Sequence, residues 1–159
     1  MIDQICFNEI FLDSAKEVFD TMIFMDMVET DEPNTNTEEM AVLGSITFKG
    51  DLEGCLSFSC SMACAQAITM NMLAMDSADQ VTEGDVCDAI GEVCNMVMGG
   101  AKKRLHHTFG VIELSIPSVV HGRELRNTIG DHVQRASAKV KIEDEYLAEM
   151  SLIYREKSN

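Results

Sequence analysis

One residue pattern occurs twice in this chain, and an internal repeat constrains the fold more than any single motif does. The pattern Asp-x-x-x-Glu-Val-x-Asp starts at Asp13, and Asp-x-x-x-Glu-Val-x-Asn starts at Asp88. Each copy has helical spacing and is followed by two segments that are rich in strand-forming residues. The sequence therefore predicts two helix–strand–strand units. They differ at the last position of the pattern, which is Asp20 in the first copy and Asn95 in the second.

The segments around these patterns predict the fold class. In chain order, we expect a helix at Asn8–Ile23, an acidic loop at Asp26–Glu39, strands at Ala41–Lys49 and Cys55–Cys60, a helix at Met62–Met75, a helix that includes Asp88–Gly100, and strands at Val111–Val120, Val133–Ile142 and Tyr146–Tyr154. Antiparallel hairpins with few helices predict an α+β fold, with helices packed on an antiparallel sheet. At 159 residues we expect one domain, 1–159, with repeat halves of about 1–75 and 76–159.

The second copy of the pattern has an unusual exposed face. At about 100° per residue, one stripe contains Asp88, Glu92, Asn95 and Gly99. The opposite side is apolar and is predicted to be buried; it consists of Ile90, Val93, Cys94, Val97 and Ala101. Each glycine in a helix interior costs roughly 1 kcal/mol relative to alanine. A stripe of short polar side chains and glycine, with Gly91 and Gly100 beside it, is therefore predicted to admit another surface at close range.

Composition narrows the classes of partner. The net charge of −15 argues against nucleic-acid binding, which requires a basic surface. The cluster Lys102–Arg104 is interpreted as basic residues at the end of the helix, where they suit the negative pole of the helix dipole. The chain has neither a secretory signal pattern nor an apolar run of about 20 residues, so we expect a cytoplasmic protein with no membrane segment. The six cysteines include no C-x-x-C pair and are predicted to be reduced core thiols.

The usual catalytic motifs are absent from the sequence. It contains no phosphate-binding glycine loop, no dinucleotide fingerprint and no nucleophile elbow, and its four histidines lack metal-ligand spacing. No metal site and no cofactor of its own are predicted. Glu92 and Asn95 remain. An exposed glutamate is a poor general acid at neutral pH. An amide both donates and accepts hydrogen bonds, so it can hold a water in line with a phosphoryl group.

The pattern Asp88-x-x-x-Glu92-x-x-Asn95, followed by the proline-bearing segment Val111–Val120, resembles the CheC/CheX/FliY phosphatases of bacterial chemotaxis. A single copy with the asparagine is closest to CheX. The resemblance implies hydrolysis of the aspartyl phosphate of a CheY-like response regulator, which itself holds Mg²⁺. It implies that Glu92 anchors a lysine of the regulator and that Asn95 orients the hydrolytic water. Asp88, Gly91 and Gly99 are predicted to contact this partner.

The resemblance also bears on the first copy and on assembly. Asp13 and Glu17 match the pattern, but Asp20 replaces the asparagine, so we expect that copy to be inactive. The resemblance implies a homodimer formed through the sheet, and Tyr146–Tyr154 is predicted to be a long edge strand that pairs with its equivalent. Two other functions remain open, a non-catalytic module that binds response regulators or flagellar-switch components and a structural dimerisation domain. The intact Asn95 favours catalysis over both.

Overall fold

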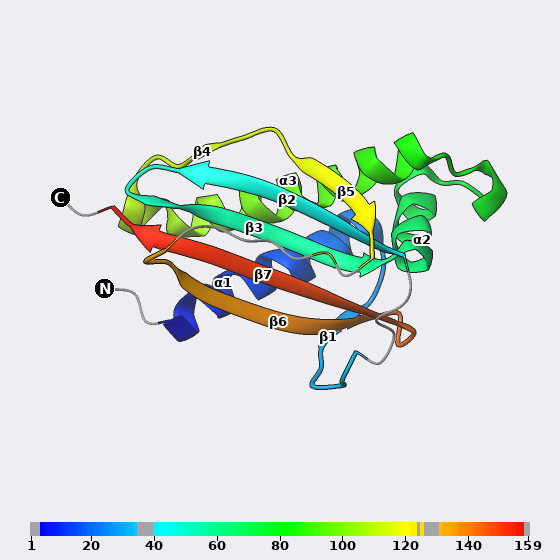
Figure 1. Cartoon of the computed structure of the whole chain (residues 1–159), viewed down its shortest axis with the longest axis horizontal. Helices are drawn as coiled ribbons and strands as arrows, with labels where there is room; N and C mark the ends of the chain where they lie inside the picture. The colour runs from blue at the N-terminus through cyan, green and yellow to red at the C-terminus, as the bar shows by residue number, and fades with distance from the viewer. Residues whose placement is uncertain (1–3, 35–39, 124, 126–130, 158–159) are drawn as a thin grey trace.

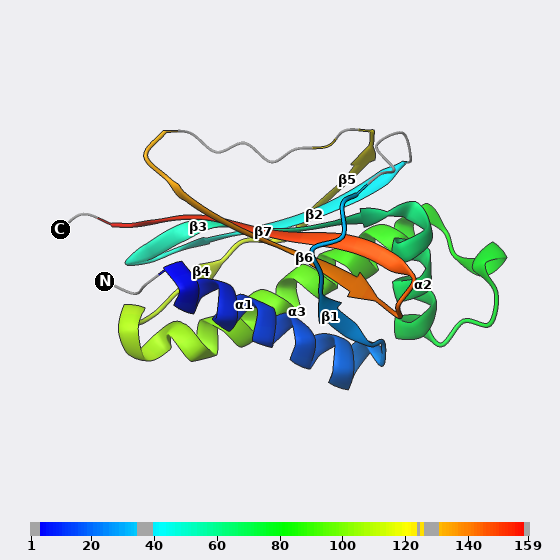
Figure 2. The ribbon, with the colours of Figure 1, turned by 90° about the horizontal axis from the view of Figure 1, so that it is seen from below.

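An antiparallel sheet forms one layer of the molecule, and two long helices cover one of its faces (Figures 1 and 2). The structure, a computed structural model, describes residues 4–34, 40–123, 125 and 131–157. The strand order is β1-β6-β7-β3-β2-β4, and β5 also pairs with β2. The helices α1 and α3 lie on the same face and run in opposite directions, while α2 lies at one end (Figure 2). The predicted α+β class is confirmed.

The elements have the following bounds. The helices are α1 (Gln4–Val18), which continues as the π-helix η1 (Phe19–Ile23), α2 (Met62–Leu73), the short 3₁₀ helix η2 (Ala78–Gln80) and α3 (Glu83–Phe109). The strands are β1 (Met27–Glu29), β2 (Ala41–Lys49), β3 (Leu52–Ser61), β4 (Glu113–Leu114), β5 (Ser118–Gly122), β6 (Gln134–Ile142) and β7 (Tyr146–Glu156). Strand β2 has the predicted bounds, whereas β3 and β7 run longer than predicted.

Three predicted segments differ from the structure. The acidic loop Asp26–Glu39 contains strand β1, whose three residues are too few to show alternation. The segment Val111–Val120 is split into β4 and β5 by a break that contains Pro117, because proline cannot donate a ladder hydrogen bond. The helix of the second copy does not end near Gly100 but continues to Phe109, since the helix interior tolerates glycine at a modest energetic cost.

The duplication is present in the topology, and its units are larger than predicted. Each unit is a helix followed by a short first strand and a long hairpin. The first unit contains α1, β1, β2 and β3, and the second contains α3, β4 with β5, β6 and β7. The short strands are exchanged, because β1 pairs with β6 while β4 and β5 pair with β2. The units meet at the antiparallel pair β3–β7. The boundary between the halves, about 1–75 and 76–159, stays a prediction.

The two copies of the pattern lie at different positions along their helices. The helical segment of the first unit ends at Ile23 and that of the second at Phe109, each followed by an exchanged edge strand. Asp20 lies in the last turn before Ile23, whereas Asn95 lies near the middle of α3. The sequence repeat is therefore out of register with the structural repeat. The first copy is not a structural counterpart of the second.

The last strand is not an edge. Strand β7 lies between β3 and β6 and is hydrogen-bonded to both along most of its length. The predicted dimer through Tyr146–Tyr154 is thus wrong as to its location, because that strand has no free side. Among the described residues, the sheet edges are β1 on one side and β4 with β5 on the other. Hydrophobic alternation marks a strand as half-buried but does not give its position in the sheet.

Helix α3 is capped at its start and packs on the sheet near its middle. A capping box starts the helix: the Asp85 amide donates to the Thr82 hydroxyl (3.1 Å), and the Thr82 amide donates to the Asp85 carboxylate (2.9 Å). These hydrogen bonds from Thr82 lower the pKa of Asp85 below its ordinary value. Further along, a Cβ at Gly44 of β2 would lie 2.7 Å from Ile90 Cγ2. Helix α3 therefore packs directly on β2, in a place where any side chain larger than glycine would push it away.

Candidate functional site on helix α3

The structure places the predicted stripe on the outer face of α3. Asp88, Glu92 and Asn95 are exposed, and Gly99 is half-buried one turn further along. The apolar side is confirmed, because Ile90, Val93, Cys94, Val97 and Ala101 are all buried in the core between α3 and the sheet. Since this face is anchored in the core, the polar stripe is carried by a rigid backbone. The name polar stripe is used below for Asp88, Glu92, Asn95 and Gly99.

The polar side chains of the stripe make no hydrogen bond or ion pair with the described part of the chain. Other exposed acids do have partners: Glu17 pairs with Arg104 (2.7 Å) and Glu83 with His121 (3.0 Å). The carboxylates of Asp88 and Glu92 and the amide of Asn95 thus keep their full hydrogen-bonding capacity. An exposed, unpaired carboxylate and an amide on one helix face can bind a cation and a water of an incoming surface.

The two glycines predicted to contact a partner have different environments. A Cβ at Gly99 would meet no atom of the described residues within 4 Å, so the fold does not require glycine there. Gly91, by contrast, is buried, and a Cβ there would lie 3.4 Å from Pro117 Cβ and 3.6 Å from Val119 Cγ2. Gly91 lets the edge strand lie against α3 and does not belong to the exposed stripe. Helical periodicity could not show this, because the covering segment comes from a distant part of the chain.

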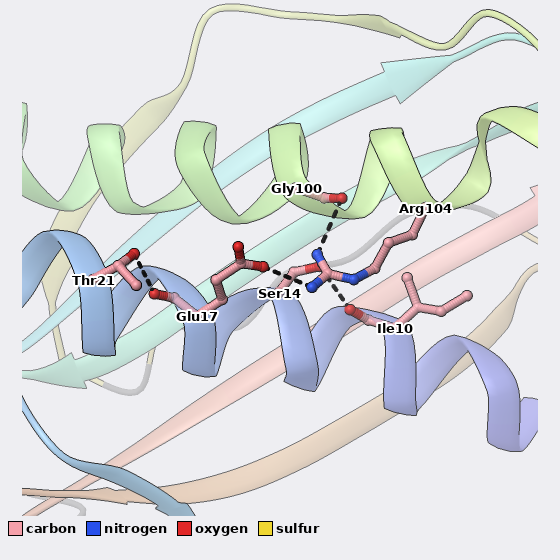
Figure 3. A network of polar contacts seen from close by, with 6 residues as sticks. All are labelled: Ile10, Ser14, Glu17, Thr21, Gly100 and Arg104. Carbon is pink, nitrogen blue, oxygen red and sulfur yellow. Dashed lines mark hydrogen bonds and ion pairs between the residues drawn. The ribbon is translucent and has the colours of Figure 1, made fainter.

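One residue of the basic cluster, Arg104, has a different role from the predicted one. Because α3 continues to Phe109, Lys102–Arg104 does not lie at the helix end. Arg104 reaches across to α1, where it donates to the Ser14 hydroxyl (2.9 Å) and to the Glu17 carboxylate (2.7 Å), and it bonds the Gly100 carbonyl of its own helix (3.4 Å) (Figure 3). A Cβ at Gly100 would lie 3.4 Å from both Ser14 Cβ and Arg104 Nη1. Arg104 and Gly100 therefore join the two helices.

The first copy of the pattern offers no equivalent surface. Asp13, Glu17 and Asp20 are exposed on α1 and η1. Glu17 is held by Arg104 and is not available in the way that Glu92 is (Figure 3). Asp20 lies within the π-helical turn and carries a carboxylate in place of the amide. This geometry supports the expectation that the copy is inactive.

The described residues include no metal-binding group, and most of their cysteines are buried. No three side chains of His, Cys, Asp or Glu among them form a group that could hold a metal ion. The described cysteines form no disulfide; Cys55, Cys60, Cys64 and Cys94 are buried and Cys87 is half-buried. Burial raises the pKa of the Cys94 thiol to about 12, so it stays protonated at neutral pH and is a poor nucleophile. The side chain of Cys6 lies outside the described residues. No helix in the described part of the chain is long and apolar enough to cross a membrane.

The sequence did not predict that the break between β4 and β5 lies beside helix α3. The break is residues 115–117, and it runs beside α3 because Pro117 lies against Gly91. It is fixed to β2 by two bonds: the Ser115 amide donates to the Thr47 carbonyl (2.9 Å), and the Thr47 amide donates to the Ser115 hydroxyl (3.0 Å). The proline was visible in the sequence, but its neighbour on α3 was not.

These features define a two-layer α+β protein with repeated helix-and-strand units and an exposed Asp–Glu–Asn stripe on a core-anchored helix. Residues 42–141 match the family model described as chemotaxis phosphatase CheX. Because the match covers more than half of the chain, the protein belongs to the CheX family of chemotaxis phosphatases.

Solved structures agree with this fold. The chemotaxis protein CheX from Vibrio vulnificus is 24% identical, with a TM-score of 0.76 over 94% of this chain and 96% of that one. A CheC-like superfamily protein from Shewanella sp. PV-4 is 26% identical, with a TM-score of 0.72 over 96% of this chain and 99% of that one. The CheX from Borrelia burgdorferi, solved with CheY, BeF₃ and Mg²⁺, is 20% identical, with a TM-score of 0.76 over 98% of this chain and 100% of that one. Among curated protein sequences, none matches the chain closely.

Proposed function

We propose that the protein hydrolyses the aspartyl phosphate of a CheY-like response regulator and so ends the chemotaxis signal. The observation that carries the proposal is the unpaired amide of Asn95, exposed near the middle of a helix whose other face is buried in the core. Membership of the CheX family supports it. A regulator as partner is supported by the solved complex of the Borrelia burgdorferi CheX with CheY.

The proposed mechanism uses positioning and not acid–base chemistry. Glu92 pairs with a cationic side chain of the regulator and fixes the orientation of α3 on its surface. Asn95 then enters the phosphorylation site, where its amide accepts a hydrogen bond from the attacking water and donates one toward the reacting group. The regulator supplies the phosphoryl group and the Mg²⁺ that neutralises its charge. A core-anchored helix suits this role, because water positioning depends on placement within fractions of an ångström.

The alternative is a binding module without catalysis, in which the polar stripe only docks to a regulator or a flagellar-switch component. Exposure of the stripe supports docking as well as hydrolysis, so binding alone does not separate the two. The rate of phosphate loss does. A labelled phospho-regulator from the same organism should decay faster as this protein is added in substoichiometric amounts. An unchanged decay rate with retained binding would rule out hydrolysis and favour the binding module.

Gly99 allows a test in which stability and activity move in opposite directions. Replacing Gly99 with alanine should raise the free energy of unfolding by roughly 0.5–1 kcal/mol, because the fold leaves room for the methyl group and glycine is a poor helix former. The same methyl group should hold the regulator away from α3, which raises KM and lowers turnover. Urea denaturation and the decay assay measure the two effects.

Gly84→Ala is the matched control for this experiment. A Cβ at Gly84 would lie 3.7 Å from the Thr82 hydroxyl, an ordinary contact, and Gly84 is exposed in the first turn of α3. It lies about 16 Å along the helix from Asn95, at 1.5 Å per residue. Because Gly84 lies one turn before Asp88, the comparison is made at saturating regulator, where its substitution should leave turnover unchanged. A Gly99→Ala protein that is more stable and fully active would show that the regulator does not approach Gly99.

We also propose that the protein is a homodimer, as the resemblance to CheX implies. Strand β7 is already paired on both sides, so pairing of strands between copies would use β1 or β4 with β5. Light scattering at micromolar concentration should give the mass of two chains. The mass of one chain would contradict the dimer.

A further inference from the structure

One large apolar side chain beside the polar stripe is almost entirely exposed. Ile116 has 89% of its surface accessible, the highest value among the large apolar side chains that the structure describes. Scattered exposed apolar residues are normal on protein surfaces, so exposure alone means little. Its position and its rigidity set Ile116 apart.

The position of Ile116 follows from two contacts with α3, one made by β5 and one made by the break that precedes it. His121 Nε2 lies 3.0 Å from the Glu83 carboxylate, and Pro117 lies against Gly91. Moving from His121 to Pro117 along the strand therefore corresponds to moving from Glu83 to Gly91 along the helix. One residue further, Ile116 comes level with the turn between Glu92 and Asn95, at about 3.3 Å per strand residue and 1.5 Å per helix residue.

The backbone that carries Ile116 is held on both sides. Ser115 exchanges two hydrogen bonds with Thr47 of β2, and its hydroxyl also donates to the Ile116 carbonyl (3.1 Å). On the other side, the ring of Pro117 fixes its own φ and packs on α3. The side chain of Ile116 is itself stiff, because it is branched at Cβ. An apolar group presented so rigidly loses little conformational freedom when a partner covers it.

We propose that Ile116 is an apolar docking contact for the response regulator, packing on an apolar side chain next to the regulator's phosphorylation site. The inference rests on the proposed function, which brings the regulator onto the polar stripe. The charged and amide groups of the stripe orient the partner. Ile116 adds an apolar contact beside them, from which water is excluded. This contact acts in the ground state and the transition state alike, so it contributes to KM and not to kcat.

Ile116→Ser tests this proposal in the intact protein. We expect KM for the phospho-regulator to rise about tenfold, as befits the loss of an apolar contact, with kcat unchanged. The ratio of mutant to wild-type KM should be the same at low and at high salt, since an apolar contact is not screened. A stability role would instead appear as a lower melting temperature, which we do not expect for so exposed a side chain.

Val111→Ser is the matched control. Val111 is also an exposed branched residue, with 69% of its surface accessible, but it follows the far end of α3. Its substitution should leave KM unchanged.

The dissociation constant for the regulator activated with beryllofluoride separates this inference from the proposed function, because it needs no turnover. A tenfold weaker constant in Ile116→Ser supports the docking contact even if the wild-type protein does not hydrolyse phosphate. An unchanged constant overturns the contact even if hydrolysis is confirmed.

Discussion

Asn95→Ala is expected to reduce the accelerated decay of the phospho-regulator by about 100-fold or more, the usual effect of removing one preorganised polar group that acts on a reacting centre. Binding of the regulator should change far less, because Glu92 and the rest of the surface remain. Asn95 is exposed and unpaired within the described structure, and alanine favours helices, so the free energy of unfolding should not fall. Single-turnover decay of a labelled regulator measures the loss.

Two variants make this test specific. Asn95→Asp should be nearly as inactive, because a carboxylate offers no donor and repels the phosphoryl group. Asp20→Asn restores the amide in the first copy of the pattern. It should create no second active surface, since Asp20 lies in the π-helical turn at the end of the helix and the neighbouring Glu17 is bound by Arg104. Near wild-type decay with Asn95→Ala would contradict the proposed mechanism.

The local features of the fold were predictable from the sequence. Alternation in Ala41–Lys49 gave strand β2 its bounds, and the Thr82–Asp85 capping box marked the start of α3. Helical spacing separated the polar stripe from the buried face. Each of these depends on interactions within a few residues or on one exposed and one buried side, and such interactions leave a periodic signal in the chain.

The features set by distant segments were not predictable in this way. Strand β7 was predicted to be an edge strand, yet it pairs with β6 on one side and with β3 on the other. Helical periodicity placed Gly91 beside the exposed stripe, yet in the structure Pro117 packs against it and it is buried. The repeat of Asp13 with Asp88 is real in the sequence but is out of register with the repeated units of the fold. In the first two cases the outcome depends on which strand pairs with which, and in the third it depends on where the helix of each unit ends.

Glu92→Lys is expected to have the other large effect. If Glu92 pairs with a cation of the regulator, reversal of its charge replaces an attraction with a repulsion, and affinity should fall tenfold or more, which corresponds to at least about 1.4 kcal/mol. Turnover at low regulator concentration should fall in proportion. In the wild-type protein both should weaken as salt rises, because exposed charges are screened over about 10 Å at 0.1 M ionic strength. Titration with the beryllofluoride-activated regulator measures the affinity.

The control for charge reversal follows from the structure. Glu17 has the same place in the first copy of the pattern, but its substitution would also break the ion pair with Arg104 that joins α1 to α3. Asp13 is exposed on α1 and has no hydrogen bond or ion pair within the described residues. Asp13→Lys therefore changes the net charge by the same amount without disturbing the helix pair, and it should leave affinity nearly unchanged. Equal losses in Asp13→Lys and Glu92→Lys would mean that the regulator responds to overall charge, and the specific role of Glu92 would then be wrong.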